Sequence, residues 1–533
     1  MNNLLLLTII VVLYLFIIAW LGWYGYKKTK NTLDYLVAGR DTHPFIMSLS
    51  YGATFISTSA IVGFGGAAAF YGLGLLWLTF LNIFVGIIIA FIIFGKRTRK
   101  MGHNLDAHTF PELLGLRFQS NFVQWFCGLI IFLFMPLYSA AVLIGAARFI
   151  ETTFSPQINF NVALLIYTLI ICAYVLAGGL KGVMYTDALQ GAIMFVGMII
   201  LLIFTYVKLG GITVAHQALA NIGNLVPAKL IQQGHQGWTH MPVYGSPLWW
   251  SLVSTIVMGV GIGVLTQPQL AVRFMTVKSN KEINRAVSIG GLFIFCMTGV
   301  AFIVGALSNV YFVNNPAFGK ISLVVAKGNI DAIIPAYINS ALPTWFVYLF
   351  MLTLLSAAMS TSSSQFHAIG TAIGRDFFEK GIWEGRNTKY TILLTRLGII
   401  VGVILTVILG FKLPDNIIAL ATAIFFGLCA STFLPAYIGA LFIKEMTKAG
   451  VIASLLTGFF GTAFWLLFIH QKESAALGLC KFIFDKPTLA SYPWTVVDPI
   501  VLILPLSLLI SVIVSLFTAR IPQEHVDNCF KHF

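Results

Sequence analysis

The sequence predicts an all-α polytopic membrane protein with about 13 transmembrane helices, since each span needs about 20 apolar residues. Two features of its composition support this class. Hydrophobic residues make up 58% of the 533-residue chain, and only 9% of its residues are charged. A soluble protein of this length needs far more polar residues to cover its surface. The composition therefore excludes a soluble enzyme, a disordered chain and a nucleic-acid-binding domain.

Thirteen apolar runs, separated by polar breaks, are the predicted spans. They cover residues 4–25, 46–70, 74–95, 122–147, 160–177, 187–207, 248–271, 286–312, 342–371, 391–411, 417–442, 449–470 and 495–518. The first run lacks a positive leading segment and a cleavage motif, so we expect it to be retained as a span. Six scattered cysteines form no CxxC pair, and neither a zinc site nor a disulfide framework is indicated.

The loop charges predict how the chain is oriented in the membrane. If the N-terminus is outside, the loops after the odd-numbered spans and the C-terminal tail hold most of the 32 lysines and arginines. The positive-inside rule then favours an external N-terminus and a cytoplasmic C-terminus in the plasma or inner cell membrane. The net charge of +14 thus reflects orientation, and we expect membrane lipid around the chain but no nucleic-acid or obligate protein partner.

Two of the spans contain glycines and hydroxyl residues that predict broken helices. The second reads MSLSYGATFISTSAIVGFGGAAAFYGLG, and the seventh reads STIVMGVGIGVLTQPQLAVRF. Close helix packing through small residues is the alternative interpretation for either span alone. Because the two spans are five apart, they cross the membrane in opposite directions. This arrangement is typical of transporters built from inverted repeats, which bind their solute near the midplane.

The ninth span carries an unusual density of hydroxyl groups. They belong to Ser356, Ser360, Thr361, Ser362, Ser363 and Ser364. Bonding to carbonyls of their own helix explains one or two of these well, but not six. Together with carbonyls freed by a broken helix, they predict an oxygen cage for a small hard cation. Asp187 enters the sixth span, where it either caps a helix or adds charge to a cation site.

Four segments together resemble the sodium:solute symporter family over nearly the whole chain. They are ATFISTSAIVGFGGAAAFYGLG, GGLKGVMYTDALQG, QPQLAVRFMTVKSNKE and SAAMSTSSSQF…RDFF, and the first is similar to the pantothenate and monocarboxylate branch. The chain departs from the family in having Gln269 where a His is common. It also has Phe366 and His367 where apolar pairs are frequent.

The resemblance implies one transporter domain, 1–533, with a five-plus-five inverted-repeat (LeuT-type) core. A first span and cytoplasmic loop would occupy residues 1–45. The two repeats would occupy 46–209 (spans 2–6) and 248–442 (spans 7–11). Residues 449–533 would form the last two spans and a cytoplasmic tail.

The resemblance also implies where sodium and solute bind. The main sodium site would use carbonyls of Ala53, Ile56 and Ala357 and hydroxyls of Ser360 and Thr361. A second sodium would use Asp187, Ser363 and Ser364 and share Ser360. Substrate candidates are Phe55, Ser57, Thr58, Ser59 and Gln267.

Three of the polar side chains near these sites have alternative roles. Gln267 equally well satisfies backbone groups freed by Pro268. Arg148 is expected to snorkel to the interface rather than clamp a carboxylate. We expect His367 to be a satisfied buried histidine rather than a proton relay.

The sequence therefore predicts a sodium-coupled importer of a small organic solute, most consistent with a monocarboxylate or a pantothenate-like anion. The alternatives are a sodium/proline-type amino acid symporter and a proton-coupled member of the same fold. An embedded enzyme is not expected, because neither HExxH nor paired intramembrane acids appear.

Overall fold

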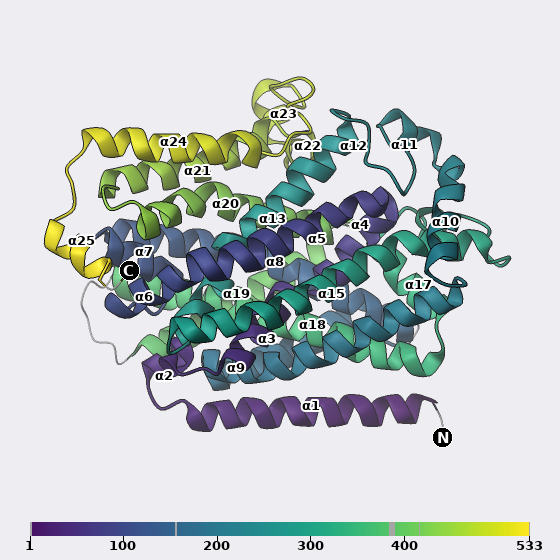
Figure 1. The fold of residues 1–533 in the computed structure, drawn as a ribbon, viewed down its shortest axis with the longest axis horizontal. Helices are drawn as coiled ribbons and strands as arrows, with labels where there is room; N and C mark the ends of the chain where they lie inside the picture. The colour runs from purple at the N-terminus through teal and green to yellow at the C-terminus, as the bar shows by residue number, and fades with distance from the viewer. Residues whose placement is uncertain (1–2, 155–156, 383–389, 415, 532) are drawn as a thin grey trace.

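A computed structural model describes the whole chain except residues 1–2, 155–156, 383–389, 415 and 532. Every regular element among the described residues is helical. Eleven of the described helices are long and apolar enough to cross a membrane. Most of the long helices lie roughly along the longest axis of the molecule (Figure 1), which gives an elongated bundle.

The first half of the bundle begins with α1 (Asn3–Lys28), which lies along one side (Figure 1). The broken second span and the third follow as α3 (Pro44–Phe55), α4 (Phe64–Tyr71), α5 (Leu76–Ile83), the π-helical stretch Phe84–Gly95 and α6 (Lys96–Asn104). The short helix α7 (Phe110–Arg117) precedes α8 (Asn121–Phe154) and α9 (Phe160–Lys208).

The helix α9 contains two antiparallel segments. Gly179 interrupts it with φ +54°, a conformation that glycine adopts at little cost. The first segment runs parallel to α18 (Thr344–Thr371). The Tyr167 hydroxyl donates to the Leu355 carbonyl, and Tyr174, further along α9, donates to the Met359 carbonyl, further along α18. In the second segment the order reverses, since Asp187 pairs with Ser364, whereas Gly197, further along, faces Thr353. The polar break GGLKG therefore separates two helical segments, as the sequence predicts.

The second half of the bundle also begins with a broken helix. It contains the fragments α12 (Pro247–Trp250), α13 (Gly259–Gly263) and α14 (Pro268–Ala271), followed by α15 (Asn280–Asn314), α18, α19 (Thr391–Lys412) and α20 (Ile418–Phe442). The helices α21 (Lys448–Phe468) and α24 (Ile500–Phe517) complete the bundle. Helix α15 crosses α4 at a contact between glycines. A Cβ on Gly305 would lie 2.1 Å from the Gly65 carbonyl oxygen, so only glycine fits there.

Two spans are broken where the sequence predicts it. The chain leaves α3 at Ile56, which has extended φ/ψ of −89° and 100°, and re-enters a helix at Ser59. In the seventh span, Gln267 is extended, with φ/ψ of −69° and 115°, and Pro268 starts the next helical turn. Both breaks lie inside the bundle, because Ile56 and Gln267 are almost fully buried.

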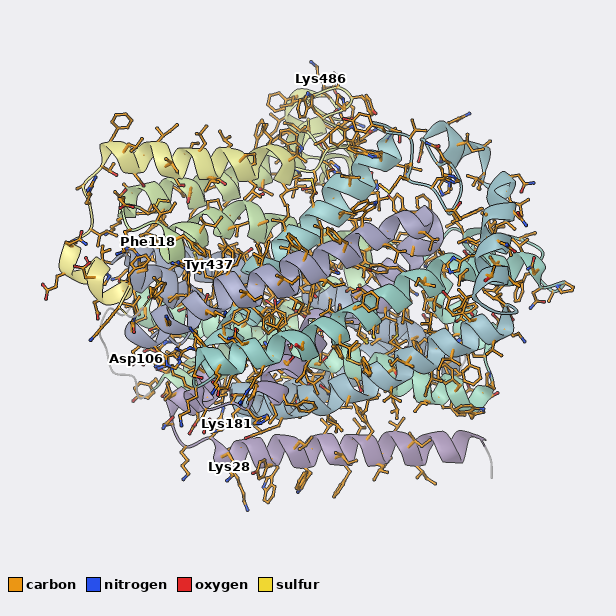
Figure 2. The ribbon with its side chains drawn as sticks, viewed as in Figure 1. Lys28, Asp106, Phe118, Lys181, Tyr437 and Lys486 are labelled. Atoms are coloured by element: carbon orange, nitrogen blue, oxygen red, sulfur yellow. The ribbon has the colours of Figure 1, made fainter. Side chains whose placement is uncertain are left out.

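The two ends of the bundle differ. Helix α25 (Gln523–Cys529) lies with α6 and α7 at the end opposite to where α1 begins (Figure 1). Lys28, Asp106 and Lys181 also gather near that end (Figure 2). Lys181 pairs with Asp34 at 2.9 Å. Burial alone would raise the pKa of Asp34, but the Lys30 amide and the Lys181 ammonium lower it.

At the other end, the segment between α9 and α12 closes over the broken span. It contains α10 (Ile212–Asn221) and α11 (Ala228–Gln232) and continues through the buried Trp238. The Trp238 indole donates to the Ala69 carbonyl at 2.8 Å, and its carbonyl accepts from the Leu73 amide at 2.7 Å. This segment is therefore bonded directly to the end of α4.

Candidate functional site

The break after α3 and the hydroxyl-rich face of α18 meet in the middle of the bundle. The Ser360 hydroxyl donates to the carbonyls of Ala53 at 2.8 Å and of Ala357 at 3.2 Å. The Thr361 hydroxyl donates to the Thr54 carbonyl at 3.0 Å. Both hydroxyl side chains are fully buried. The structure thus brings together four of the residues expected to hold the main sodium, beside the extended Ile56.

This cluster has the chemistry of a sodium cage. Its carbonyl and hydroxyl oxygens are hard, uncharged ligands, and the extended backbone at Ile56 leaves carbonyls without helical partners. Each hydroxyl donates its proton away from its own lone pairs, which stay free for a cation. The sequence can predict this face because residues three and four apart on a helix point the same way.

Two of the residues expected to form the second sodium site, Asp187 and Ser364, bind an arginine instead. Arg273 Nη2 lies 2.9 Å from Asp187 Oδ2 and 2.6 Å from the Ser364 hydroxyl. Asp187 Oδ2 also accepts from Ser50 at 2.8 Å and from Thr54 at 3.2 Å. Asp187 therefore neither lies at a span end nor caps a helix, because it sits fully buried in the middle of this network.

Because Arg273 follows the predicted span 248–271, the positive-inside rule counts it among the cytoplasmic loop charges, and this expectation is wrong. The structure buries its guanidinium completely at the position expected for a second cation. The segment QPQLAVR could have indicated a special role for Arg273, because the family motif also has an arginine at that position. Ser363 donates to the Ser360 carbonyl at 3.0 Å, whereas the Ser364 hydroxyl donates to Asp187 and so joins the network.

A small cavity of about 20 Å³ lies next to the break. Its walls are largely aromatic, and no charged side chain among the described residues lines it. The lining residues are Phe55, Ile56, Ser57, Ala60, Phe64, Leu78, Asn82, Tyr138, Val260, Thr298, Phe302, Thr422 and Phe426. The Asn82 side-chain oxygen is buried without a hydrogen-bond partner among these residues or elsewhere in the described chain. The sequence analysis did not single out Asn82, although it is the only amide in the otherwise almost wholly apolar third span, 74–95, and this could have indicated it.

The predicted substrate residues divide into two groups. Phe55 and Ser57 line the cavity. Thr58 instead donates to the Val142 carbonyl, and the Ser59 hydroxyl has no partner in the described part of the chain. Gln267 donates to the Gly263 carbonyl at 3.2 Å, so its amide satisfies backbone beside Pro268.

The two remaining polar candidates make local contacts. Arg148 pairs with Glu151 at 3.1 Å, is about one-third exposed and stacks over Phe160, as a snorkelling side chain does. His367 is buried and bonds to the Tyr35 carbonyl at 3.0 Å.

A buried ion-pair cluster holds α7 against the stretch Ala372–Ile382, which follows α18. Arg375 binds Glu112 in two bonds, at 2.8 and 3.1 Å, and the Glu112 carboxylate also accepts from the His108 amide. Burial alone would raise the pKa of Glu112. The hydrogen bonds from His108 and Arg375 and the charge of Arg375 overcome this effect and lower the pKa to about 2.

Comparisons with known proteins agree with this architecture. The chain is 26% identical over 471 residues to the osmoregulated proline transporter OpuE of Bacillus subtilis, covering 86% of this chain and 89% of that protein. It is 25% identical over 482 residues to the sodium/proline symporter 2 of Staphylococcus saprophyticus, covering 87% of each. These relatives are named for proline, so the expected closeness to a pantothenate or monocarboxylate branch is not supported.

A solved structure shares the fold. A sodium-coupled sialic acid symporter, in a substrate-bound outward-open state, superposes with a TM-score of 0.74 at 18% identity over 98% of both chains. The model of the sodium:solute symporter family matches residues 35–458. This multi-pass protein of the plasma membrane therefore belongs to the sodium:solute symporter family, and Na⁺ is its coupling ion.

Proposed function

We propose that this protein imports a small zwitterionic amino acid, with proline as the first candidate, together with sodium. The main support for this proposal is the cavity beside the break at Ile56. It is small, its walls are aromatic and aliphatic, and no charged side chain among the described residues lines it. A zwitterion carries its own counter-charge and fits such a site without a protein ion. The names of the relatives support the same solute.

The break supplies a place for each end of the solute. The carboxylate would bind at the start of the Ser59–Gly63 turn, as anions do at helix N-termini, and would replace Ser57 as the acceptor for the amides of Ser59 and Ala60. The aromatic rings of Phe55, Phe302 and Phe426 offer apolar surface to a pyrrolidine ring. Asn82 and Ser57 then provide polar groups for the remaining hydrogen bonds. The match is one of chemistry, because a cavity of about 20 Å³ holds only one water-sized occupant and the break must open further to admit the solute.

Sodium in the main cage would couple to solute through the same break. An ion held by Ala53, Ile56, Ala357, Ser360 and Thr361 fixes the backbone that the solute must contact. Part of the ordering cost is then met before the solute arrives, so each ligand strengthens binding of the other. Inward movement of one sodium gains about 2.3 kcal/mol per 100 mV of membrane potential.

The proposed topology has thirteen crossings, because the stretches Ser59–Asn104 and Phe160–Lys208 each contain parts of two spans. The N-terminus is outside and the C-terminus cytoplasmic. Spans 2–6 (46–209) and 7–11 (248–442) form the two inverted repeats. The breaks at Ile56 and Gln267, in the first span of each repeat, support this division.

A second sodium beside Asp187 requires Arg273 to withdraw first, because the guanidinium occupies that position. We therefore propose that the main cage holds the coupling ion in the conformation described here. Ser363, Ser364 and Asp187 can take part in a second site only in a different conformation. A monocarboxylate or pantothenate-like anion is the weaker candidate, since its charge would have to be balanced by sodium alone.

Uptake by purified protein in proteoliposomes tests this function. The assay compares labelled proline, other amino acids, short monocarboxylates and pantothenate under an inward sodium gradient, a proton gradient or neither. We expect proline to accumulate only with the sodium gradient. Proton-driven accumulation, or uptake of a monocarboxylate but not of proline, would contradict the proposal.

A further inference from the structure

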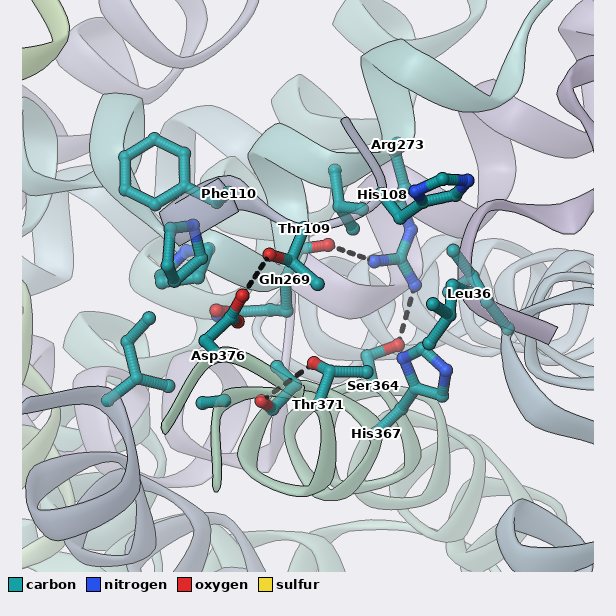
Figure 3. A pocket seen from close by; sticks show the side chains of 17 residues that line it. Leu36, His108, Thr109, Phe110, Gln269, Arg273, Ser364, His367, Thr371 and Asp376 are labelled. Atoms are coloured by element: carbon teal, nitrogen blue, oxygen red, sulfur yellow. Dashed lines mark hydrogen bonds between the residues drawn. The ribbon is translucent and has the colours of Figure 1, made fainter. Parts of the chain in front are cut away.

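A second small cavity lies between the buried Arg273–Asp187 pair and the α7 end of the bundle (Figure 3). It has a volume of about 20 Å³, enough for one water-sized occupant. Arg273 and Ser364 line its inner side, and His108 and Thr109 line the side toward α7. The cavity thus adjoins the ion-binding centre on the side where the C-terminal helix lies.

Asp376 places an unbalanced carboxylate in this cavity. It follows α18 in the stretch Ala372–Ile382 and is fully buried. Its Oδ1 accepts from the Thr109 hydroxyl at 2.7 Å and from the Gln124 amide at 2.8 Å. Its Oδ2 has no hydrogen-bond partner among the residues that the structure describes. The neighbouring Arg375 is bound in two bonds by Glu112 and leaves this oxygen without a direct partner.

Gln269, which lines the same cavity, has a second buried oxygen, Oε1, without a hydrogen-bond partner among the described residues. The orientation of its amide is fixed by a relay from the backbone. The Gln267 Nε2 donates to the Gly263 carbonyl at 3.2 Å, which leaves Gln267 Oε1 to accept from Gln269 Nε2 at 3.3 Å. Reversing either amide would set oxygen against oxygen. Gln269 Oε1 is therefore the free end of the relay, buried and without a partner in the described chain.

Two buried acceptors line one cavity, and neither has a donor. Water would supply hydrogen bonds, but only a proton or a cation balances the charge of a carboxylate in a low-dielectric interior, where an isolated ion is very costly. A monovalent cation satisfies both needs, and carboxylate and amide oxygens are ligands that hard cations prefer.

We propose that this cavity is a sodium site, with Asp376 Oδ2 and Gln269 Oε1 as protein ligands and water completing the shell. The ion is the coupling ion that has left the main cage and passed Ser364 and Arg273 toward the cytoplasm. The site is a stop on the release route and is separate from the Ser360 cage. It goes beyond the proposed solute, because it depends only on sodium and on residues of this chain.

Equilibrium binding of ²²Na⁺ to the purified full-length protein in detergent, at pH 8 and constant ionic strength with choline, tests the site. We expect Asp376→Asn to lose one bound sodium per protein, through an affinity loss of at least about a hundredfold. Gln269→Leu removes one ligand and should weaken the same component. Thr371→Val is the matched control. Thr371 lines the cavity, but its hydroxyl donates to the Ala368 carbonyl at 3.0 Å, so binding should not change.

Two further variants separate the site from the main cage and from misfolding. Ser360→Ala should remove the other sodium component, and the double variant with Asp376→Asn should bind none. Gln269→His keeps the carboxylate but brings an N–H donor to it, and should displace sodium from a folded protein. Unchanged ²²Na⁺ stoichiometry in Asp376→Asn would overturn the proposal. So would unchanged sodium binding combined with a loss of proton uptake, which would assign the cavity to a proton.

Discussion

Arg273 Nη2 lies 2.9 Å from Asp187 Oδ2, and neither side chain has any exposed surface. Two bonds from the guanidinium to Thr54 and Ser364 extend this pair to α3 and α18. Because an arginine is not deprotonated in proteins, the pair cannot neutralise itself by moving a proton to solvent. Any movement that parts the turn Val272–Thr276 from α9 must therefore provide each charge with a new partner.

Arg273→Gln is expected to lower the free energy of unfolding by about 3–5 kcal/mol, because it leaves Asp187 as an unpaired buried charge. Asp187→Asn should also lower the free energy of unfolding, because it leaves Arg273 as an unpaired buried charge. The double variant should be more stable than the sum of the two losses predicts, since no charge is then left alone. Thermal unfolding of the purified variants measures this coupling, and strictly additive losses would contradict it.

Ser360→Ala and Thr361→Ala should each raise the sodium concentration for half-maximal uptake, while the order of preferred solutes is unchanged. Each removes one oxygen ligand, at a cost of about tenfold or more in apparent sodium affinity. Ser362→Ala is the matched control, because this buried hydroxyl on the same helix has no partner in the described chain. A sodium response in Ser360→Ala equal to that of Ser362→Ala would refute the assignment of the cage.

Asn82→Leu should weaken solute binding by about tenfold, because it removes the buried amide that faces the solute cavity. Sodium-induced thermal stabilisation, measured without solute, should persist. Thr79→Val tests whether the loss of any polar side chain on this helix has the same effect. The Thr79 hydroxyl is buried and has no hydrogen-bond partner among the described residues, but Thr79 does not line the cavity. Equal losses of uptake in both variants would mean that the effect is not specific to the cavity.

The ion pair between Glu112 and Arg375 should make stability depend on pH. The pKa of Glu112 falls on folding from an ordinary value of 4.5 to about 2. A group of this kind stabilises the fold above its unfolded pKa and loses that contribution as the pH falls from 4.5 toward 2. The contribution is about 3 kcal/mol. The thermal unfolding temperature should therefore fall between pH 6 and pH 3, and Glu112→Gln should largely remove this fall. An equally steep fall in the variant would show that the pH dependence does not come from Glu112.

Helical spacing predicts that Ser360, Ser363 and Ser364 share one face of α18. In the structure Ser360 bonds to α3 and Ser364 to Asp187, whereas Ser363 bonds to its own helix. Thr361 was implied only by the family resemblance. The break at Gln267 was predictable from Pro268, which cannot continue a helix. The break at Ile56 comes before the glycines of its span. Gly65 and Gly66 are helical and closely packed, so the pattern indicated the broken span but not the residue at which it breaks. Arg273 was misplaced because hydropathy and the positive-inside rule assign cations to loops. Its burial depends on a partner, Asp187, that lies 86 residues away in the chain.

The solute cavity was predicted only in part. Phe55 and Ser57 follow from the break itself, but Asn82, Phe302 and Thr422 come from three other helices and meet only in the folded bundle. The cavity lined by Gln269 and Asp376 depends on even more contacts between residues far apart in the sequence. The orientation of Gln269 is fixed by Gln267 and, through it, by the Gly263 carbonyl, which no residue pattern reveals.

The bonding of Trp238 to Ala69 and Leu73 has a practical consequence. This indole is buried and attached to the last turn of α4, so outward tilting of that half-helix must change the polarity around a natural fluorophore. The difference between the emission spectra of the wild type and Trp238→Phe would then isolate one of the 11 tryptophans. Opening and closing of the transporter could be followed in real time as sodium is added, without an attached dye.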